Sequence, residues 1–306
     1  MTKLVIQVPC FNEEDTLPRT LEDLPGRVDG CDQVEVLIVD DGSTDRTVEV
    51  ARNAGVQHIL QLPRNRGLAG AFASGLNRAL ELGADVIVNT DGDHQYQGRY
   101  IPNLVQPILD GRADVVVGDR RIGQRKGYPR FKRWLQQTGS RVVGWTSGLD
   151  VPDATSGFRA FSREAALRVV IHTGYTYTAE TLIQAGKTGL AVAFVPIEIN
   201  EQLRESRLIK SVPGFVVKSA AAILRIFLMY EALRVFVIMG SLMIGGGLLL
   251  AGRYVYFFAV GEGQGHVQSL ILATILILMG FLSFMLGMLA DLIAKNRRLN
   301  EETLYR

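Results

Sequence analysis

Apolar and polar positions alternate in blocks along the first 120 residues, and the blocks repeat in a regular order. Short apolar runs of strand length are separated by stretches with helical spacing. The runs predict five buried strands, at Leu4–Pro9, Val34–Asp40, His58–Leu62, Val86–Thr90 and Val115–Asp119. The intervening stretches predict helices at Glu14–Leu24, Thr44–Ala54, Gly67–Gly83 and Tyr100–Asp110. This alternation predicts an α/β fold with a mostly parallel sheet covered by helices on both faces.

The last third of the chain is strongly apolar. Val235–Gly252 and Val267–Ala290 contain no charged residue, and the second run is long enough to cross a hydrocarbon core of about 30 Å. The first run reaches that length by continuing past Arg253, a residue that can extend its charge to the membrane surface, into an aromatic stretch. We therefore expect a two-helix transmembrane hairpin over residues 234–306. A pair of buried core helices is the alternative.

Charges around these runs predict how they lie in a membrane. The turn at residues 261–266 has no Lys or Arg, whereas basic residues flank the opposite ends: Arg225, Arg234, Lys295, Arg297 and Arg298. The positive-inside rule then places both termini, and a catalytic domain of residues 1–210, in the cytoplasm. Residues 211–233 mix charged and apolar side chains, which predicts an amphipathic helix in the membrane interface. Glycines at 245–247, 280 and 287 permit close helix packing, so a homo-oligomer formed through them stays open.

Composition narrows the classes of function. The 306 residues carry a formal net charge of only +2, so nothing indicates a nucleic-acid partner. The only cysteines, Cys10 and Cys31, lack metal-ligand spacing and are expected to be small buried side chains in a reducing compartment. The N-terminus lacks the long apolar segment of a signal peptide.

Acidic residues follow three of the predicted strands. Glu13 and Glu14 follow the first, Asp40 and Asp41 end the second with Asp45 just beyond, and Asp91 and Asp93 follow the fourth. Ser43, Thr44 and Asp45 are also candidate caps for the second helix. Parallel strands bring such residues to one edge of the sheet. Because unpaired carboxylates repel each other, their convergence calls for a cation, and Asp91 and Asp93 are suited to Mg²⁺ or Mn²⁺. In isolation, the Asp-Gly-Asp motif would equally suit a surface turn.

The ordered motifs resemble a known enzyme family. They are Pro9-Cys10-Phe11-Asn12-Glu13-Glu14, Val39-Asp40-Asp41-Gly42-Ser43-Thr44-Asp45, Asn65-Arg66-Gly67-Leu68-Ala69-Gly70, Asp91-Gly92-Asp93-His94-Gln95, Val117-Gly118-Asp119-Arg120-Arg121 and residues 153–161. Together they are similar to the family 2 inverting glycosyltransferases of GT-A fold, in the dolichyl- or polyprenyl-phosphate sugar synthase branch. Prokaryotic members of that branch also carry C-terminal transmembrane hairpins.

The resemblance implies roles for individual residues. Those matching the nucleoside-binding positions are Pro9, Phe11, Glu13 and Asp40, with Asp41 completing that motif. Asp91, Asp93 and Gln95 match the metal site. Arg120 and Arg133 match positions that bind the acceptor phosphate, and Arg204 lies in a segment that resembles a mobile loop of the family. Gln137 stands where the branch often has Ser, which is a departure from the pattern.

The implied reaction is metal-dependent transfer of a hexose, with inversion, from a donor of the GDP-mannose or UDP-glucose type to a polyprenyl phosphate. A lipid phosphate is already ionised and needs cations to position it rather than a base. Transfer to a hydroxyl of another membrane acceptor is the alternative, and it would need a base, for which Glu180 is the candidate. A further alternative is an inactive membrane subunit or small transporter.

Two other readings are disfavoured by the motifs. The absence of a Gln-x-x-Arg-Trp motif argues against a processive polysaccharide synthase. Gly67, Gly70 and Gly75 lack the spacing of a dinucleotide fingerprint, so close helix packing is expected of them instead.

Overall fold

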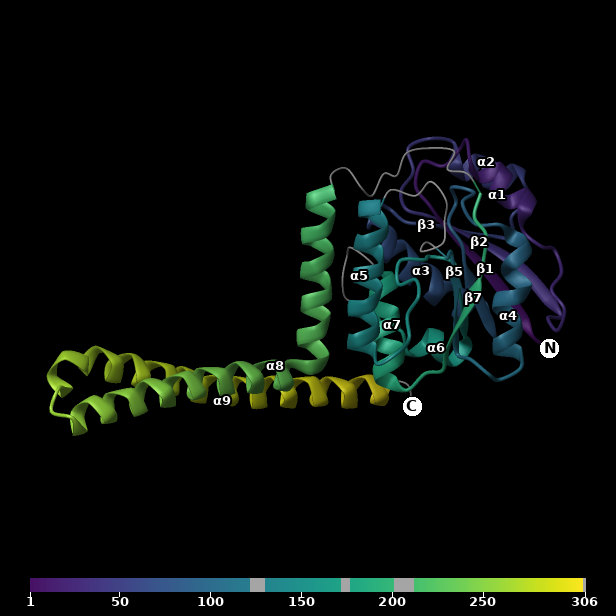
Figure 1. Ribbon diagram of the computed structural model, residues 1–306. Helices are drawn as coiled ribbons and strands as arrows, with labels where there is room; N and C mark the ends of the chain where they lie inside the picture. Colours follow the sequence, from purple (N-terminus) through teal and green to yellow (C-terminus); the bar gives the residue numbers. More distant parts are fainter. Residues whose placement is uncertain (122–129, 172–176, 201–211, 305–306) are drawn as a thin grey trace. The chain divides into compact units, whose positions relative to one another are not determined.

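A seven-stranded sheet forms the centre of the N-terminal part of the chain (Figure 1). The computed structural model describes residues 1–121, 130–171, 177–200 and 212–304, and the chain forms two compact units, residues 1–223 and 224–306. The strand order is β3-β2-β1-β4-β6-β5-β7. The strands are β1 (Lys3–Cys10), β2 (Gln33–Asp40), β3 (His58–Gln61), β4 (Val86–Asn89), β5 (Val115–Asp119), β6 (Arg159–Ser162) and β7 (Val192–Pro196).

The predicted mostly parallel sheet is confirmed, and it contains two strands that were not predicted, the antiparallel β6 and the parallel β7. β1 pairs in parallel with both β2 and β4, and β5 pairs in parallel with β7. β6 lies between β4 and β5 and runs antiparallel to both. This strand was not predicted, because it is four residues long and begins with the charged residue Arg159, so it lacks an apolar run. The sheet is therefore mixed.

Helices cover both faces of the sheet (Figure 1). α1 (Leu17–Asp23), α2 (Thr47–Asn53) and α4 (Ile101–Leu109) lie on one face. α3 (Leu68–Glu81) packs on β1 and β2 from the other face, next to α6 (Arg163–Arg168) and α7 (Tyr177–Thr188). α5 (Arg130–Ser147) packs outside α7.

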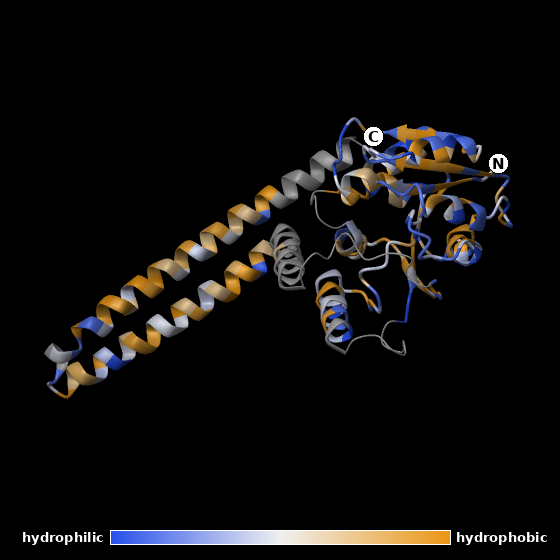
Figure 2. Cartoon of the chain, turned by 90° about the horizontal axis from the view of Figure 1, so that it is seen from above, coloured by the Kyte–Doolittle hydropathy of each residue, from blue (hydrophilic) through white to orange (hydrophobic). Residues whose placement is uncertain are grey.

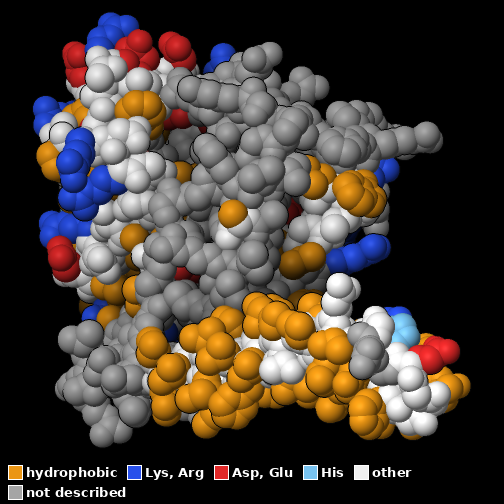
Figure 3. All heavy atoms as spheres, turned by 90° about the vertical axis from the view of Figure 1, so that its left-hand side faces the viewer, with side chains coloured by type: hydrophobic (Ala, Val, Ile, Leu, Met, Phe, Trp, Pro, Cys, Tyr) orange, Lys and Arg blue, Asp and Glu red, His pale blue; other side chains and the backbone are white. Residues whose placement is uncertain are grey.

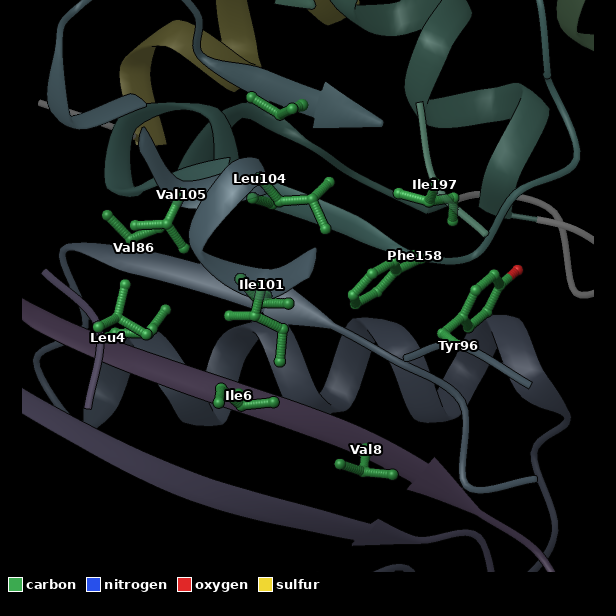
Figure 4. Packing of buried hydrophobic residues seen from close by; sticks show 14 of the residues in the cluster. Leu4, Ile6, Val8, Val86, Tyr96, Ile101, Leu104, Val105, Phe158 and Ile197 are labelled. Atoms are coloured by element: carbon green, nitrogen blue, oxygen red, sulfur yellow. The ribbon is translucent and has the colours of Figure 1, made fainter. Parts of the chain in front are cut away.

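The main core fills the space between α4 and the sheet (Figure 4). Leu4, Ile6 and Val8 alternate along β1 and point toward α4, as the period of two in a strand requires. On the opposite face, Gly75 of α3 approaches β1 so closely that a Cβ there would lie 2.4 Å from Gln7 Oε1. The prediction of close helix packing is thus confirmed at Gly75.

The start of α2 differs from the prediction. The helix begins at Thr47, with Arg46 in the N-cap position and no cap bond from that side chain. Neither Ser43 nor Thr44 therefore caps it. Asp45 takes part instead, because its Oδ1 accepts the Thr47 N–H at 3.0 Å and the Thr47 hydroxyl at 2.5 Å.

The C-terminal unit contains two long apolar helices. α8 (Val212–Ala259) and α9 (Val267–Leu304) contain candidate membrane spans at Ala232–Ala259 and Val267–Ile293. Apolar residues dominate the described parts of both spans (Figure 2), and apolar side chains cover most of the surface that these parts show in Figure 3. The prediction of two apolar helices long enough to cross a membrane is confirmed, and most of their side chains are exposed, unlike those of core helices. Residues 212–233 form part of α8, and the predicted domain boundary at residue 210 lies outside the described residues.

Small residues let the two hairpin helices touch. A Cβ at Gly240 would lie 2.8 Å from the Gly280 carbonyl oxygen, and a Cβ at Gly280 would lie 2.8 Å from that of Gly240. Gly247 and Gly287 make equally close approaches, to the Ala273 carbonyl oxygen and Phe236 Cβ. These glycines thus serve the contact within the hairpin.

We predict that Gly280→Leu lowers the thermal stability of the purified full-length protein, because the new side chain must force two backbones apart. Overpacking of this kind costs about 1–3 kcal/mol. Gly245→Leu is the matched control, since a Cβ at Gly245 meets no atom within 4 Å. Thermal unfolding in detergent measures both, and equal melting temperatures for the two variants would contradict the described helix contact.

Candidate functional site

Three acidic segments meet at the carboxyl ends of β1, β2 and β4. The register pairs Cys10 with Asp40, and the Asp41 N–H donates to the Cys10 carbonyl at 2.8 Å. Burial raises the pKa of the Cys10 thiol well above its usual value. Nearby negative charges from all three segments raise it further, namely Glu13, Asp40, Asp91 and Asp45. The structure therefore brings together the acidic residues that the sequence placed after separate strands.

The first acidic segment is fixed to the second by short hydrogen bonds. The Glu13 N–H donates to Thr47 Oγ1 at 2.8 Å, and the Asn12 N–H donates to Ser43 Oγ at 2.9 Å. The Thr44 N–H donates in turn to Asn12 Oδ1 at 2.8 Å. Because these bonds run in both directions, the two loops form a single rigid wall of the site.

The Asp91-Gly92-Asp93 turn packs directly on the first segment. A Cβ at Gly92 would lie 2.9 Å from Cys10 Sγ, so only glycine allows this approach. The Gly92 carbonyl accepts the hydroxyls of Thr16 and Thr20 at 2.9 and 3.1 Å. Glycine thus positions the two flanking carboxylates, both of which are partly exposed and can reach a ligand.

The second half of the turn is held by the chain that follows β7. Asp93 Oδ1 accepts the Gln95 N–H at 3.2 Å, and the Gln95 carbonyl accepts the Asn200 N–H at 2.9 Å. Asn200 Nδ2 also donates to the His94 carbonyl at 3.0 Å. Asn200 precedes the segment that contains Arg204, and Arg204 itself lies outside the described residues.

Asp91 lies against the backbone of Gly157. A Cβ at position 157 would lie 3.2 Å from Asp91 Oδ2 and 2.8 Å from the Tyr177 hydroxyl. A buried polar network fixes this glycine from behind. Asn89 Nδ2 donates to the Gly157 carbonyl at 2.8 Å, and the Gly157 N–H donates to the Tyr96 hydroxyl at 3.0 Å.

The same network extends into the sheet. Gln7 Nε2 donates to Asn89 Oδ1 at 2.9 Å, and Asn89 Nδ2 also donates to the Tyr177 hydroxyl at 3.0 Å. Burial raises the pKa of Tyr96 to about 12 and that of Tyr177 well above its usual value, so both phenols stay neutral donors or acceptors. The floor beneath Asp91 is thus preorganised by hydrogen bonds within the protein.

Arg120 binds the other end of the loop that contains Gly157. Its guanidinium binds Asp153 with two bonds, Nε–Oδ2 at 2.7 Å and Nη2–Oδ1 at 2.9 Å, and Nη2 also donates to Thr155 Oγ1 at 2.5 Å. Burial alone would raise the pKa of Asp153, but the charge and hydrogen bonds of Arg120, together with the hydrogen bonds from Thr155, outweigh it and lower the pKa. Residues 153–157 therefore connect the cation Arg120 to the carboxylate Asp91.

Arg159 fixes this loop from inside the domain. It is fully buried, and it donates to the carbonyls of Ser156 and Ala154 at 2.8 and 3.1 Å as well as to Thr181 Oγ1. Burial lowers the pKa of Arg159 to about 10. The guanidinium thus serves as a multivalent donor that holds the backbone in one conformation.

The two carboxylates of the second acidic segment, Asp40 and Asp41, accept hydrogen bonds from different parts of the chain. Asp40 Oδ1 accepts the Ser43 N–H at 3.1 Å, within its own turn. Asp41 Oδ1 accepts the Arg66 N–H at 2.7 Å and so ties the turn to the loop that precedes α3. Burial raises the pKa of Asp41, although the N–H groups of Arg66 and Gly67 act in the opposite direction.

The remaining expected residues are spread around this centre. Pro9 is the penultimate residue of β1 and is buried, and Phe11 follows the strand and is partly exposed. Arg133 lies partly buried in the first turn of α5. Glu180, the candidate base, is fully buried in α7, where Gln184 Nε2 approaches its Oε1 at 3.5 Å.

The residues present suit a divalent metal. Asp91 and Asp93 offer hard oxygen ligands on one glycine turn, and Gln95 adds an amide oxygen. Among the described residues no group of three or more His, Cys, Asp or Glu side chains could hold a metal ion alone. A metal held by these oxygens would need further ligands, which phosphate oxygens and water commonly supply to Mg²⁺.

Several residues that hold the acidic segments in place have a recognisable sequence pattern, but the sequence analysis gave them no role. Gln7 interrupts an apolar strand and Asn89 ends another, and a polar residue in a buried strand indicates a network. Asp153, Gly157 and Arg159 lie in a motif that carried the family resemblance without individual roles. Their functions depend on tertiary contacts with Arg120 and Asp91, which no local pattern specifies.

Comparison with known proteins agrees with this geometry. The family model for glycosyl transferase family 2 matches residues 5–169. The undecaprenyl-phosphate mannosyltransferase of Micrococcus luteus is 30% identical over 219 residues, covering 68% of this chain and 88% of the relative. The dolichyl-phosphate hexose transferase of Haloferax volcanii is 34% identical over 205 residues, covering 67% and 86%.

A solved structure supports the fold. Glucosyl-3-phosphoglycerate synthase from Mycobacterium tuberculosis, in complex with Mn²⁺, UDP-glucose and phosphoglyceric acid, superposes with a TM-score of 0.60 at 23% identity, over 74% of this chain and 80% of that one. The mixed sheet and its covering helices are thus of the GT-A kind. With its acidic sheet edge, its matched family model and relatives that align over most of their own length, the chain belongs to glycosyltransferase family 2.

Proposed function

We propose that this enzyme transfers a hexose from a nucleotide-sugar to a polyprenyl phosphate, with inversion and with a divalent metal. The observation that carries the proposal is the arrangement around residues 153–157, which joins a cation at Arg120 to the carboxylates at Asp91 and Asp93. A donor diphosphate bound through metal at one end and an acceptor phosphate bound by arginine at the other would meet along this loop. The relatives from Micrococcus and Haloferax are named for transfer to such lipid phosphates.

The donor side would use the acidic wall. Glu13 and Asp40 are buried at the ends of β1 and β2, where their oxygens can accept hydrogen bonds from a ribose or base. Asp91, Asp93 and Gln95 would hold Mg²⁺ or Mn²⁺. When bound, the metal would act as a Lewis acid that stabilises the departing nucleoside diphosphate.

The acceptor side would use cations. Arg120 is locked in orientation by Asp153, and Arg133 extends from α5. Arg204 follows Asn200, which is bound to the metal motif, and four residues of chain span up to about 14 Å. Together they would neutralise and align a phosphate for attack on the anomeric carbon.

The burial of Glu180 favours a phosphate acceptor over a hydroxyl. A general base must lie within hydrogen-bond reach of the hydroxyl that it deprotonates. The Glu180 side chain is 0% exposed and so offers no surface to an incoming acceptor. A phosphate acceptor needs no such base, because it is ionised near neutral pH.

The membrane placement of the enzyme is part of the proposal. Residues 1–210 would form the cytoplasmic catalytic domain, 211–233 the interfacial helix, and 234–306 the hairpin, with both termini in the cytoplasm. The two apolar helices and the distribution of Lys and Arg around them support this topology.

The direct test is a transfer assay with the purified full-length protein. Radiolabelled GDP-mannose, UDP-glucose and related donors would be supplied with Mg²⁺ or Mn²⁺ and a short polyprenyl phosphate. We expect one donor to yield a lipid-extractable product, and Asp93→Asn to reduce the rate by about 100-fold or more, since a metal supplies several kcal/mol of stabilisation. Asp110→Asn, an exposed carboxylate paired with Arg112, should retain full activity. A metal-independent product would contradict the proposal.

A second prediction concerns the acceptor. Arg133→Ala and Arg204→Ala should each raise the KM for polyprenyl phosphate by about 10- to 100-fold, the value of a hydrogen bond to a charged group. Nucleotide affinity, measured by calorimetry, should stay unchanged, and Arg112→Ala should change neither. If either variant loses nucleotide binding while its KM for the lipid is normal, that arginine belongs to the donor side.

A third prediction concerns the buried ion pair. Asp153→Asn should lower the free energy of unfolding by about 2–4 kcal/mol near neutral pH, because it leaves Arg120 buried without its partner. The pKa of Asp153 is lowered in the folded protein, so its stabilisation is present above the unfolded value of about 3.9 and is lost as pH falls through the folded value. The difference between wild type and variant should therefore shrink below about pH 4.

Thermal unfolding of both proteins across pH measures this. The exposed pair Asp110–Arg112 provides the control, since Asp110→Asn should leave stability unchanged at every pH. A constant difference between wild type and Asp153→Asn down to the lowest pH would contradict the ion-pair explanation.

A further inference from the structure

Unfavourable backbone conformations are concentrated at the carboxyl edge of the sheet. Among the residues that the structure describes, three residues other than glycine have a positive φ: Asn12 at 55°, His94 at 57° and Arg121 at 46°. Each lies within five residues of the end of β1, β4 or β5 and adjoins a residue of the candidate site. Residues with a side chain seldom adopt this left-handed conformation, and surrounding contacts must hold those that do.

His94 is the one that lies inside the candidate metal motif. It separates Asp93 from Gln95, and Asp93 Oδ1 accepts the Gln95 N–H at 3.2 Å across it. The left-handed turn at His94 therefore brings these two ligand residues together. For an L-amino acid this conformation is less favourable than the right-handed one, because Cβ crowds the following carbonyl oxygen. The turn consequently depends on contacts from elsewhere in the chain.

Asn200, which follows β7, supplies such contacts. Its Nδ2 donates to the His94 carbonyl at 3.0 Å, and its N–H donates to the Gln95 carbonyl at 2.9 Å. One residue, 106 positions away from His94 in the sequence, thus holds two successive carbonyls of the turn. Both bonds restrain the backbone directly on the C-terminal side of the left-handed residue.

Asn200 is itself held in one orientation. Gln97 Nε2 donates to Asn200 Oδ1 at 2.8 Å, so the side-chain amide is bonded at its oxygen as well as at its nitrogen. A β-bridge also joins the neighbouring residues Tyr96 and Ile199. The Asn200 amide therefore cannot turn without breaking a hydrogen bond.

We propose that Asn200 is a positioning residue of the metal site. By holding His94 in the left-handed conformation, it directs Asp93 and Gln95 toward one divalent ion. The inference rests on the proposed function, in which these residues and Asp91 bind Mg²⁺ or Mn²⁺. Residues that orient metal ligands without touching the metal commonly set its affinity.

The test measures Mn²⁺ binding to the purified full-length protein by electron paramagnetic resonance, with Mn²⁺ alone and with UDP or GDP added. Asn200→Ala removes the donor to His94 and should weaken Mn²⁺ binding by about 3- to 10-fold, as expected for the loss of one hydrogen bond. Glu198→Gln is the matched control. It breaks the exposed Arg99–Glu198 pair two residues away and should leave the Mn²⁺ affinity unchanged.

A second substitution separates positioning from general loss of structure. Glycine adopts a positive φ without an anchor. His94→Gly should therefore restore most of the Mn²⁺ affinity to the Asn200→Ala protein, and alone it should leave that affinity nearly unchanged. Wild-type affinity in Asn200→Ala, or a loss that His94→Gly does not restore, would overturn the inference. So would a loss of affinity in His94→Gly alone, since the imidazole itself would then be needed.

Hydrogen exchange of the wild type provides a test that does not depend on the folding of a variant. The anchor and the metal favour the same turn, so Mn²⁺ with UDP or GDP should slow exchange of the Asn200 amide. The Ala191 amide, which donates to Asp114 at the start of β7, should be unaffected. Bound Mn²⁺ without this protection would contradict the role of Asn200 alone. A wild type that binds no Mn²⁺ would contradict the proposed function and this inference with it.

Discussion

Negative charge concentrated at one edge of the sheet is the constraint on which the site depends. Glu13, Asp40, Asp45 and Asp91 all act on the thiol of Cys10, which stays neutral because it is buried. Carboxylates gathered in this way repel each other, and hydroxyl and backbone N–H groups donate to several of them. Thr16 Oγ1 donates to Glu13 Oε2, the Ser43 N–H to Asp40 Oδ1 and the Arg66 N–H to Asp41 Oδ1. A bound cation would relieve the repulsion, and this is the physical reason for proposing that the cluster binds a metal.

Positive charge is organised differently a short distance away. Arg120 forms a two-bond ion pair with Asp153 and also donates to Thr155, which restricts its orientation. The loop that contains these partners continues to Gly157. The hydrogen bonds of Gln7 and Asn89 hold Gly157 in place, and its backbone lies against Asp91. One short loop therefore contains both the partners of Arg120 and the glycine that lies against Asp91, and fully buried Arg159 donates to the backbone of that loop. Rigid placement of this kind serves catalysis by orientation.

The parts of this protein that were predictable are those with a local signature. A buried strand such as Leu4–Pro9 is recognisable in the sequence as an apolar run. The C-terminal helices are recognisable in the same way from their much longer apolar runs. β6 was missed because Arg159 heads a four-residue strand, and its side chain is buried only through contacts with Ala154, Ser156 and Thr181. The helix cap expected at Ser43 or Thr44 was misplaced because Ser43 bonds Asn12 of another loop instead. Long-range contacts decided each of these cases.

The central claim is that the converging carboxylates form a metal site completed by the donor. Electron paramagnetic resonance of Mn²⁺ titrated into the full-length protein, with and without a nucleoside diphosphate, tests it most directly. The account predicts a bound Mn²⁺ whose affinity rises with nucleotide and which is lost when Asp91 and Asp93 are both replaced by Asn. Equal Mn²⁺ binding by that double variant, or no binding by the wild type even with nucleotide, would contradict it.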